Sequence, residues 1–192
     1  MDRTTVIFVR HAQSLHPYSD ERTRPLTETG MEDRSLVLDT LRGRHIDAFL
    51  SSPYLRSVQT VSPAAESFGL EVRTDERFRE RLNGPGAGAP GTLEKRWADL
   101  SFAEEGGESL GEVQRRNIEA INDDLRAYAG RTIVVGTHGT ALSTILNYYD
   151  PSFGLEEYRG ISYLMPYIVE MVFDGDKLTE KKVLAFTDRS PR

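Results

Sequence analysis

Two of the four histidines in the chain stand directly after short apolar runs. His11 follows the letters VIFVR, and His138 follows TIVVGT. Such runs predict strands that are covered on both faces, and in open α/β sheets ligands bind just beyond the carboxyl ends of these strands. If the two strands are parallel neighbours, both imidazoles lie at one edge of the sheet, where a binding site is expected.

The chemistry that suits this pair is the attack of an imidazole on a phosphoryl group. A neutral imidazole is a nucleophile, and a neighbouring arginine such as Arg10 can hold the transferring oxygens. A metal pair is the weaker alternative, because the sequence has no His-Glu-x-x-His motif and no acidic residue within several positions of either histidine. Taken singly, each histidine is more often a structural residue at a strand end, but their matching positions favour a shared site.

Strand and helix patterns alternate along the chain and predict an α/β fold. The first helix is expected to begin at the N-cap Thr27, and a long helix at Ser109. Strands are expected at 6–9, 46–50, 70–74 and 132–136, with longer closing strands near 166–173 and 178–186. Helices are expected at 27–41, 55–68, 109–130 and from about 140 to 149.

Composition narrows the classes of protein. A chain of 192 residues fits one domain, 1–192, and its net charge of −6 argues against general binding to nucleic acid or to anionic membranes. No apolar run approaches the roughly 20 residues of a membrane span, and no leader precedes the first strand. Without cysteine there are no disulfides or thiolate metal sites, so a cytoplasmic protein is the default expectation.

Five stretches resemble the histidine phosphatase superfamily, which includes the cofactor-dependent phosphoglycerate mutases. The letters RHAQS at 10–14 resemble its Arg-His-Gly-x-Thr/Ser signature. Further stretches resemble later family motifs in the same order, at 25–30 (PLTETG), 51–60 (SSPYLRSVQT), 106–109 (GGES) and 135–139 (VGTHG). The resemblance runs from residue 6 to about 146 and implies a three-layer α-β-α sandwich around a mostly parallel sheet.

The resemblance also implies a phosphoenzyme mechanism. His11 would carry the phosphoryl group, while Arg10, Arg56 and His138 would hold its oxygens. Arginine suits this task because its planar fork binds phosphate oxygens in pairs and stays charged. Ser14 and Gly139 are further predicted to bind substrate, although Ser14 could instead cap a turn. Taken alone, Arg56 on a helix face would be a solvated residue.

The family places a general acid in the loop after the third strand, which makes Glu80 the candidate. It would protonate the leaving oxygen and later take a proton from water. Glu76 is the nearest competitor, and a merely solvated charged loop is the alternative. Neither a metal nor a cofactor is expected, so activity should survive a chelator.

The same resemblance predicts a small cap insertion at about 81–108. The stretch 83–92 (NGPGAGAPGT) reads as a flexible loop, and a cap helix is expected after it. On this helix Lys95, Arg96 and Trp97 either line the entrance or form a solvated basic face with one core-directed tryptophan. Three positions depart from the family pattern and put the substrate in doubt: Ala12 for glycine, Gln13 for glutamate, and Pro17 for asparagine.

The favoured function is hydrolysis of a small phosphorylated metabolite. A mutase must exclude water from its phosphohistidine, whereas the cap segment here is short and the chain ends soon after the last expected strand. Phosphoglycerate mutase-type transfer is the first alternative, and a non-catalytic phosphoryl-binding module is the second. Either a monomer or a homodimer is expected. His16 and His45 read as ordinary loop residues.

Overall fold

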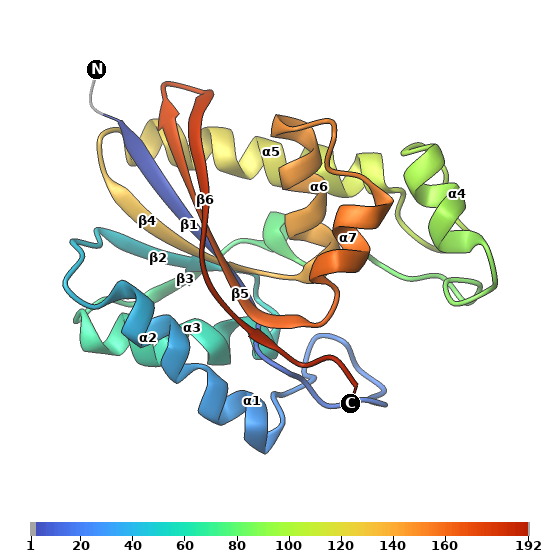
Figure 1. The fold of residues 1–192 in the computed structure, drawn as a ribbon, viewed down its shortest axis with the longest axis horizontal. Coiled ribbons are helices and arrows are strands. Elements are labelled where there is room, and N and C mark those ends of the chain that lie inside the picture. Colours follow the sequence, from blue (N-terminus) through green and yellow to red (C-terminus); the bar gives the residue numbers. More distant parts are fainter. Residues whose placement is uncertain (1–2, 192) are drawn as a thin grey trace.

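The computed structural model describes residues 3–191 of the chain. Figure 1 shows one twisted sheet with helices on both sides, and the order of its six strands is β3-β2-β4-β1-β5-β6. The predicted three-layer α/β fold is confirmed. The strands are β1 (Thr4–Arg10), β2 (Ala48–Ser51), β3 (Val72–Thr74), β4 (Thr132–Thr137), β5 (Leu164–Asp174) and β6 (Lys177–Asp188).

The strands that carry the two histidines are parallel neighbours. In β1 and β4, Arg10 lies opposite Thr137, so His11 and His138 leave the sheet side by side. The backbone N–H of His11 extends this pairing by donating to the Thr137 carbonyl at 3.0 Å. β2, β3, β4 and β1 pair in parallel, whereas β5 and β6 join β1 as an antiparallel hairpin.

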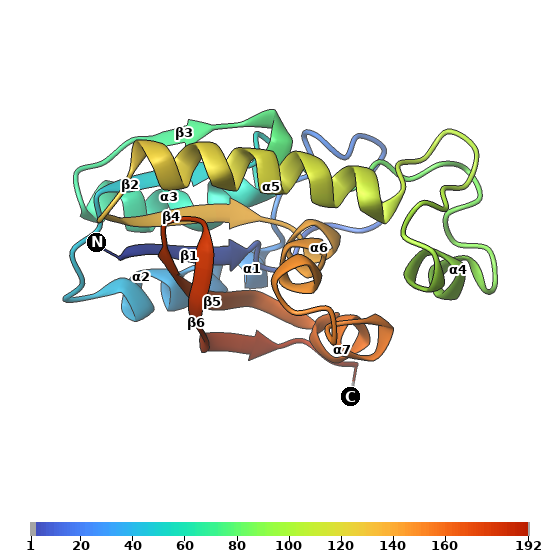
Figure 2. The same ribbon diagram turned by 90° about the horizontal axis from the view of Figure 1, so that it is seen from above.

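Both faces of the central strands are buried, as their apolar runs predict. In β1, Ile7 and Val9 face one core, which contains α2 (Ser35–Leu41) and α3 (Leu55–Ser67). Val6 and Phe8 face the other core, which contains α5 (Leu110–Ala127) and α6 (Gly139–Tyr149). Figure 2 shows these two helical layers on opposite sides of the sheet.

Several elements differ from the sequence-based prediction. The single helix expected at 27–41 is divided into α1 (Glu28–Asp33) and α2, with the break at Arg34. α1 is fixed by Gly30, where a Cβ atom would lie 2.0 Å from the Gln13 carbonyl oxygen, whereas α2 is fixed by burial of Val37 and Leu41. Arg34 itself keeps helical backbone angles, with φ −63° and ψ −15°, and is the C-cap of α1 and the N-cap of α2. β2 and β3 are also shorter than predicted.

Two short helical elements were not predicted. A 3₁₀ turn, η1 (Glu76–Phe78), begins at Asp75, whose side chain accepts from the backbone N–H of Arg77. A further helix, α7 (Leu155–Ile161), fills the connection between α6 and β5. Local periodicity cannot reveal elements this short, because three to seven residues form too few turns to show a pattern.

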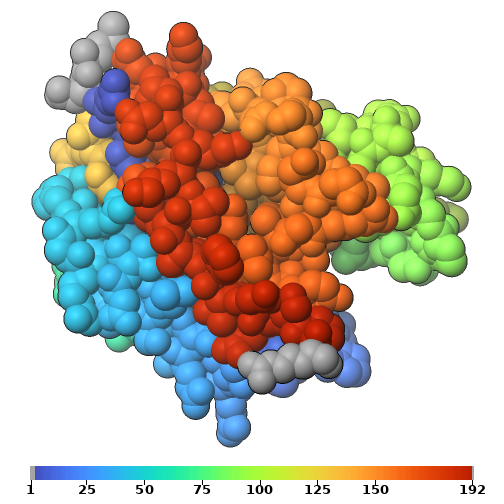
Figure 3. Space-filling model, in the orientation of Figure 1, coloured from blue at the N-terminus to red at the C-terminus, as the bar shows by residue number. Residues whose placement is uncertain are grey.

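The segment at 81–108 projects from one end of the sheet and contains α4 (Thr92–Ala98), shown in green in Figures 1, 2 and 3. A buried carboxylate, Glu104, holds it together by accepting from Arg81 Nη2 at 2.5 Å, Arg96 Nε at 3.0 Å and the Gly84 N–H at 2.9 Å. Trp97 packs on Phe153 and Tyr158, with ring centroids 6.5 and 5.5 Å away.

The boundaries of this cap segment, 81–108, stay a prediction. One interpretation of α4 is a solvated basic face formed by Lys95 and Arg96. This is wrong for Arg96, which is buried in an ion pair with Glu104, and correct for Lys95, which is exposed.

Candidate active site

His11 and His138 meet at the carboxyl edge of the sheet, as their positions at the ends of β1 and β4 require. Their ring centroids are 5.3 Å apart and the rings meet edge to face. His11 is 6% exposed and His138 is fully buried. The two rings are therefore in direct contact. The hydrogen bonds of each ring determine which of its nitrogens carries the proton.

The hydrogen bonds of His11 fix which of its ring nitrogens carries the proton. Its Nδ1 lies 2.7 Å from the Ala12 carbonyl, and because a carbonyl only accepts, Nδ1 carries the proton. Nε2 then keeps its lone pair and accepts from Arg56 Nε at 3.2 Å. Burial and the charges of Arg56 and Arg10 hold the pKa of His11 well below its usual value. The ring is thus neutral near pH 7, as a nucleophile must be.

The His138 ring is held in the role of a donor. Ser52 Oγ accepts from the Tyr54 N–H at 3.2 Å and lies 2.7 Å from His138 Nε2. Among residues 3–191, Nε2 is the one acceptor that the hydroxyl hydrogen of Ser52 reaches, so we assign that hydrogen to Nε2. A neutral ring that accepts at Nε2 carries its proton on Nδ1. Nδ1 is buried and hydrogen-bonds no atom of residues 3–191. Burial, followed by the charge of Arg56, lowers the pKa of His138 well below its usual value.

Arg56 lies against the nucleophile at the start of α3. The side chain is fully buried, and protein groups accept hydrogen bonds from its guanidinium. Nη1 donates to the Glu21 carbonyl at 2.6 Å and Nη2 to Glu21 Oε2 at 3.1 Å. Burial lowers the pKa of Arg56 to about 10, so the side chain stays charged at neutral pH. A solvated position on a helix face is therefore excluded for Arg56.

Arg10 is anchored by carbonyl oxygens that follow α7. Nη1 donates to Ile161 and Leu164 at 2.5 and 3.3 Å, and Nη2 donates to Ser162 at 2.9 Å. These bonds use three of its five N–H groups, and Nε has no partner among residues 3–191. Gly139 packs on the guanidinium, where a Cβ atom would lie 3.0–3.2 Å from Nη2, Cζ and Nε.

Glu80 lies at the N-terminus of α6, close to both strand ends. Oε1 accepts from the N–H groups of Arg81 at 2.8 Å and Ala141 at 3.0 Å. Oε2 accepts from the Thr140 N–H at 2.9 Å, which is its one hydrogen bond among residues 3–191. The competing Glu76 instead pairs with Arg22 at the surface.

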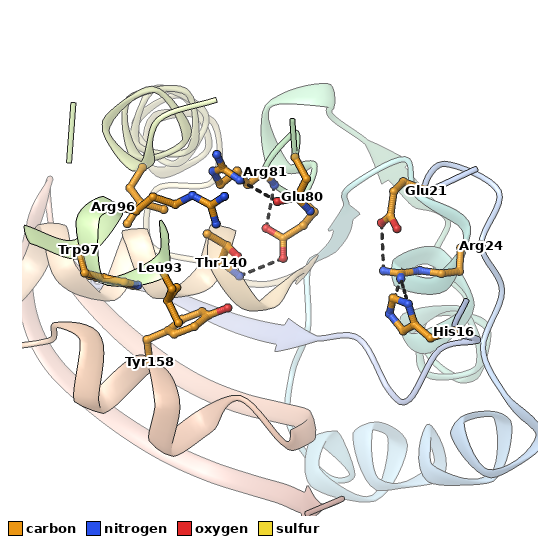
Figure 4. A pocket seen from close by; sticks show the side chains of 12 residues that line it. His16, Glu21, Arg24, Glu80, Arg81, Leu93, Arg96, Trp97, Thr140 and Tyr158 are labelled. Carbon is orange, nitrogen blue, oxygen red and sulfur yellow. Dashed lines mark hydrogen bonds and ion pairs between the residues drawn. The ribbon is translucent and has the colours of Figure 1, made fainter. Parts of the chain in front are cut away.

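A cavity of about 520 Å³ opens over these groups. Its lining includes every predicted site residue except the more deeply buried His138, namely Arg10, His11, Ser14, Arg56, Glu80 and Gly139. A second hollow of about 200 Å³ adjoins it and shares His16, Arg24 and Glu80 with it (Figure 4). Trp97, Arg96 and Tyr158 line its far side, so the cap segment contributes to the wall.

Four residues of the site were not predicted from the sequence. Ser52 orients His138, and Glu21 contacts Arg56. Arg24 and His16 line both hollows. His16 and His45 are both exposed loop residues, and His16 differs in contacting Arg24. The loop at 15–25 has no periodic pattern, so only its place beside the PLTETG stretch could have drawn attention to Arg24.

Two classes of feature are absent from residues 3–191. No three histidine, aspartate or glutamate side chains there are grouped so that they could hold a metal ion. Nor does that part of the chain contain a helix long and apolar enough to cross a membrane.

Comparison with known proteins agrees with this geometry. The model of the histidine phosphatase superfamily (branch 1) matches residues 6–184. The probable phosphoglycerate mutase GpmB of Yersinia pestis (strain Pestoides F) is 31% identical over 163 residues, which cover 74% of this chain and 73% of that protein.

Two solved structures share the fold. The mycobacterial glucosyl-3-phosphoglycerate phosphatase has a TM-score of 0.75 at 19% identity, covering 94% of this chain and 97% of that one. A phosphoserine phosphatase mutant from Entamoeba histolytica, in complex with phosphoserine, has a TM-score of 0.76 at 19% identity, covering 95% and 96%. At these identities the likeness concerns the fold alone.

Proposed function

The chain belongs to branch 1 of the histidine phosphatase superfamily, and from this we propose that it hydrolyses a small phosphate monoester through a phosphohistidine on His11. The observation that carries the proposal is the state of His11. Its Nδ1–H donates to a carbonyl, its Nε2 lone pair accepts from Arg56 Nε at 3.2 Å, and the residue lines the cavity.

In the first step, His11 Nε2 attacks phosphorus. A bond from nitrogen to phosphorus forms while the bond to the ester oxygen breaks, and its electron pair stays on the leaving oxygen. Arg56 and the Nδ1–H of His138 donate to the phosphoryl oxygens, as do the N–H groups that remain on Arg10. Arg56 and His138 are fully buried and Arg10 is half-buried, and hydrogen bonds to other protein groups hold all three side chains in place.

Glu80 is proposed to handle the protons. Its Oε2 gives a proton to the leaving oxygen, and it accepts one from the water that then attacks phosphorus. That attack breaks the nitrogen–phosphorus bond, returns the electron pair to His11 and releases inorganic phosphate. No step needs a metal, because arginine and histidine side chains supply the positive charge and the donors.

Phosphatase chemistry is favoured over mutase chemistry by the cavity over His11, because exposed residues such as Leu15 and Tyr163 line it and it therefore reaches the surface. Water can reach a phosphoryl group on His11 through it. Mutase-type transfer is the second candidate, because the relative that is 31% identical is named a probable phosphoglycerate mutase. A phosphoglycerate substrate would have to stay bound while the phosphoryl group returned to it.

The test is direct. Purified protein, dialysed against a chelator, should release phosphate from p-nitrophenyl phosphate and from a panel of small phosphate monoesters. A coupled phosphoglycerate mutase assay is run beside it. Mutase turnover that exceeds phosphate release would reverse the assignment, and a need for added magnesium would contradict the metal-free mechanism. Phosphate binding without any turnover would indicate the non-catalytic module.

The role of Glu80 is tested by the leaving group. Glu80→Gln keeps the size of the side chain but cannot donate that proton, so single-turnover phosphorylation should slow much more with an alkyl phosphate than with p-nitrophenyl phosphate. Glu76→Gln is the matched control and should slow neither. Equal slowing with both esters would assign Glu80 to binding or structure.

A further inference from the structure

The loop at 15–25 brings a second buried arginine to the nucleophile. Its two ends are joined by the Ser14–Leu26 bridge, and the Leu55 N–H donates to the Arg22 carbonyl, which fixes the loop to α3. Within this frame Arg24 is only 5% exposed. Figure 4 shows its guanidinium between Glu21 and His16, across the hollow from Trp97 and Tyr158.

One carboxylate oxygen joins Arg24 to Arg56. Glu21 Oε2 lies 3.0 Å from Arg24 Nη2 and 3.1 Å from Arg56 Nη2. Arg56 Nε, on the same edge of that guanidinium, donates to His11 Nε2. The donor beside the nucleophile, which a phosphoryl oxygen would use, is therefore occupied by a carboxylate.

The three side chains differ in their freedom to move. The side chains of Arg56 and Arg24 are 0% and 7% exposed, whereas that of Glu21 is 49% exposed. Glu21 can swing into solvent, but the two guanidinium groups cannot. Leaving two buried cations without an anion between them is unfavourable unless another anion takes that position.

We propose that Arg24 is a third phosphate-binding arginine beside Arg10 and Arg56, and that Glu21 is an internal anion which fills the site between Arg24 and Arg56 until the phosphoryl group displaces it. The inference rests on the proposed function only in placing a phosphoryl group at His11. Arg24 Nε has no partner among residues 3–191 and remains available to a ligand. The charge of Arg24 also contributes to the lowered pKa values of His11 and His138, as expected for a group close to both.

A purely structural role for Glu21 and the proposed competing role predict opposite changes in anion binding when the charge of Glu21 is removed. If the ion pairs served only to hold the loop at 15–25, removing the carboxylate charge would loosen Arg56 and weaken anion binding. If Glu21 competes with the phosphoryl group, removing its charge strengthens anion binding. The direction of the change therefore separates the two roles.

The experiment measures binding of inorganic phosphate and of vanadate by titration calorimetry, without turnover. Glu21→Gln should lower Kd about three- to tenfold, and Arg24→Gln should raise it at least about tenfold, the usual scale for a hydrogen bond to a charged group. Glu76→Gln is the matched control, because it removes the same charge from a pair with Arg22 that touches neither Arg24 nor Arg56. Its Kd should change less than twofold.

Unchanged or weaker binding by Glu21→Gln would overturn the proposal, as would unchanged binding by Arg24→Gln. If Arg24→Gln fails to fold, Arg24→Lys takes its place, and its melting temperature shows whether it is folded. It should also bind phosphate and vanadate more weakly than the unaltered protein, because the point charge of an ammonium group cannot span two oxygens. If the binding test contradicts the roles of Arg24 and Glu21, hydrolysis of p-nitrophenyl phosphate by the unaltered protein would still support the proposed function. Conversely, the predicted binding pattern without any turnover would preserve this inference and reject the proposed function.

Discussion

His11 and His138 end neighbouring parallel strands, lie with ring centroids 5.3 Å apart, and are both buried enough to stay neutral. Their surroundings nevertheless prepare them for different tasks. The ring of His11 donates its N–H to the Ala12 carbonyl and keeps its lone pair on Nε2, where it accepts from Arg56. The ring of His138 accepts from Ser52 and keeps an N–H that has no partner among residues 3–191.

The difference shows that the position of a histidine at the sheet edge does not set its role. The partner of the opposite ring nitrogen does so, because a neutral imidazole has one donor and one acceptor and fixing one fixes the other. In His11 the carbonyl binds the N–H on Nδ1, so Nε2 keeps a lone pair and can act as a nucleophile. In His138 the Ser52 hydroxyl donates to Nε2, so Nδ1 carries the N–H and can donate a hydrogen bond. The predictions at His11, His138 and Ser52 test this division, and a last one concerns a buried group outside the site.

The largest effect is expected at His11. His11→Ala removes the atom that accepts the phosphoryl group, so turnover should fall by at least about a thousandfold. Rapid quenching with radiolabelled substrate should trap no acid-labile phosphoprotein in this variant. A phosphoryl group trapped on His138 would reverse the two roles.

A smaller loss is expected at His138. His138→Ala removes one donor to the phosphoryl oxygens, for which about 100- to 1000-fold in turnover is the usual scale. The same quench experiment should still trap phosphate on residue 11, though slowly. A loss as large as that of His11→Ala, with no trapped intermediate, would mean that the two rings act as one unit.

Ser52 provides the sharpest test of the tautomer argument. Ser52→Ala removes the hydroxyl that donates to His138 Nε2, so the ring can place its proton on either nitrogen. Turnover should fall about tenfold, on the scale of one lost hydrogen bond. Nitrogen-15 NMR should show the protonated nitrogen of His138 shifting from Nδ1 while that of His11 stays unchanged.

Ser57→Ala is the matched control for this change. Ser57 is equally buried, but its hydroxyl contacts Ser51 and not the imidazole. It should leave both ring signals unaltered. An unchanged His138 signal in Ser52→Ala would show that something other than the hydroxyl sets the tautomer.

The smallest effect on activity is expected at Asp124, a buried titratable group of α5 outside the site. Burial raises the pKa of Asp124 from 3.8 to about 7, and the charge of Asp75 adds to this. Because the folded pKa lies above the unfolded one, the group is neutral in the folded protein at low pH. Stability is then lost as pH rises from about 4 to about 7.

Asp124→Asn removes this cost, so the free energy of unfolding at pH 8 should rise by about 2 kcal/mol, with little change at pH 4 and unchanged turnover. Urea unfolding at the two pH values measures it. Asp123→Asn is the contrast: Asp123 is exposed and paired with Arg77, so its loss should be neutral or slightly destabilising. Equal behaviour of the two variants would contradict the burial argument.

The sequence by itself determined the sheet edge and most of the side chains that meet there. Apolar runs that continue without alternation predict buried strands, and the carboxyl ends of neighbouring parallel strands meet at one edge. His11, His138 and Gly139 could therefore be placed from the runs before them. Arg56 and Glu80 could be placed only because the stretches around them resemble a known family.

Tertiary structure alone decided what each group does. The partner of His11 Nε2 is 45 residues away in the chain, and the partner of His138 Nε2 is 86 residues away. The loop that carries Glu21 and Arg24 has no periodicity, and its conformation follows from the bridge at its ends and its contact with α3. Hydrogen bonds across such separations exist only after the chain has packed, because local sequence sets backbone pattern and burial but not the distant partner of a side chain.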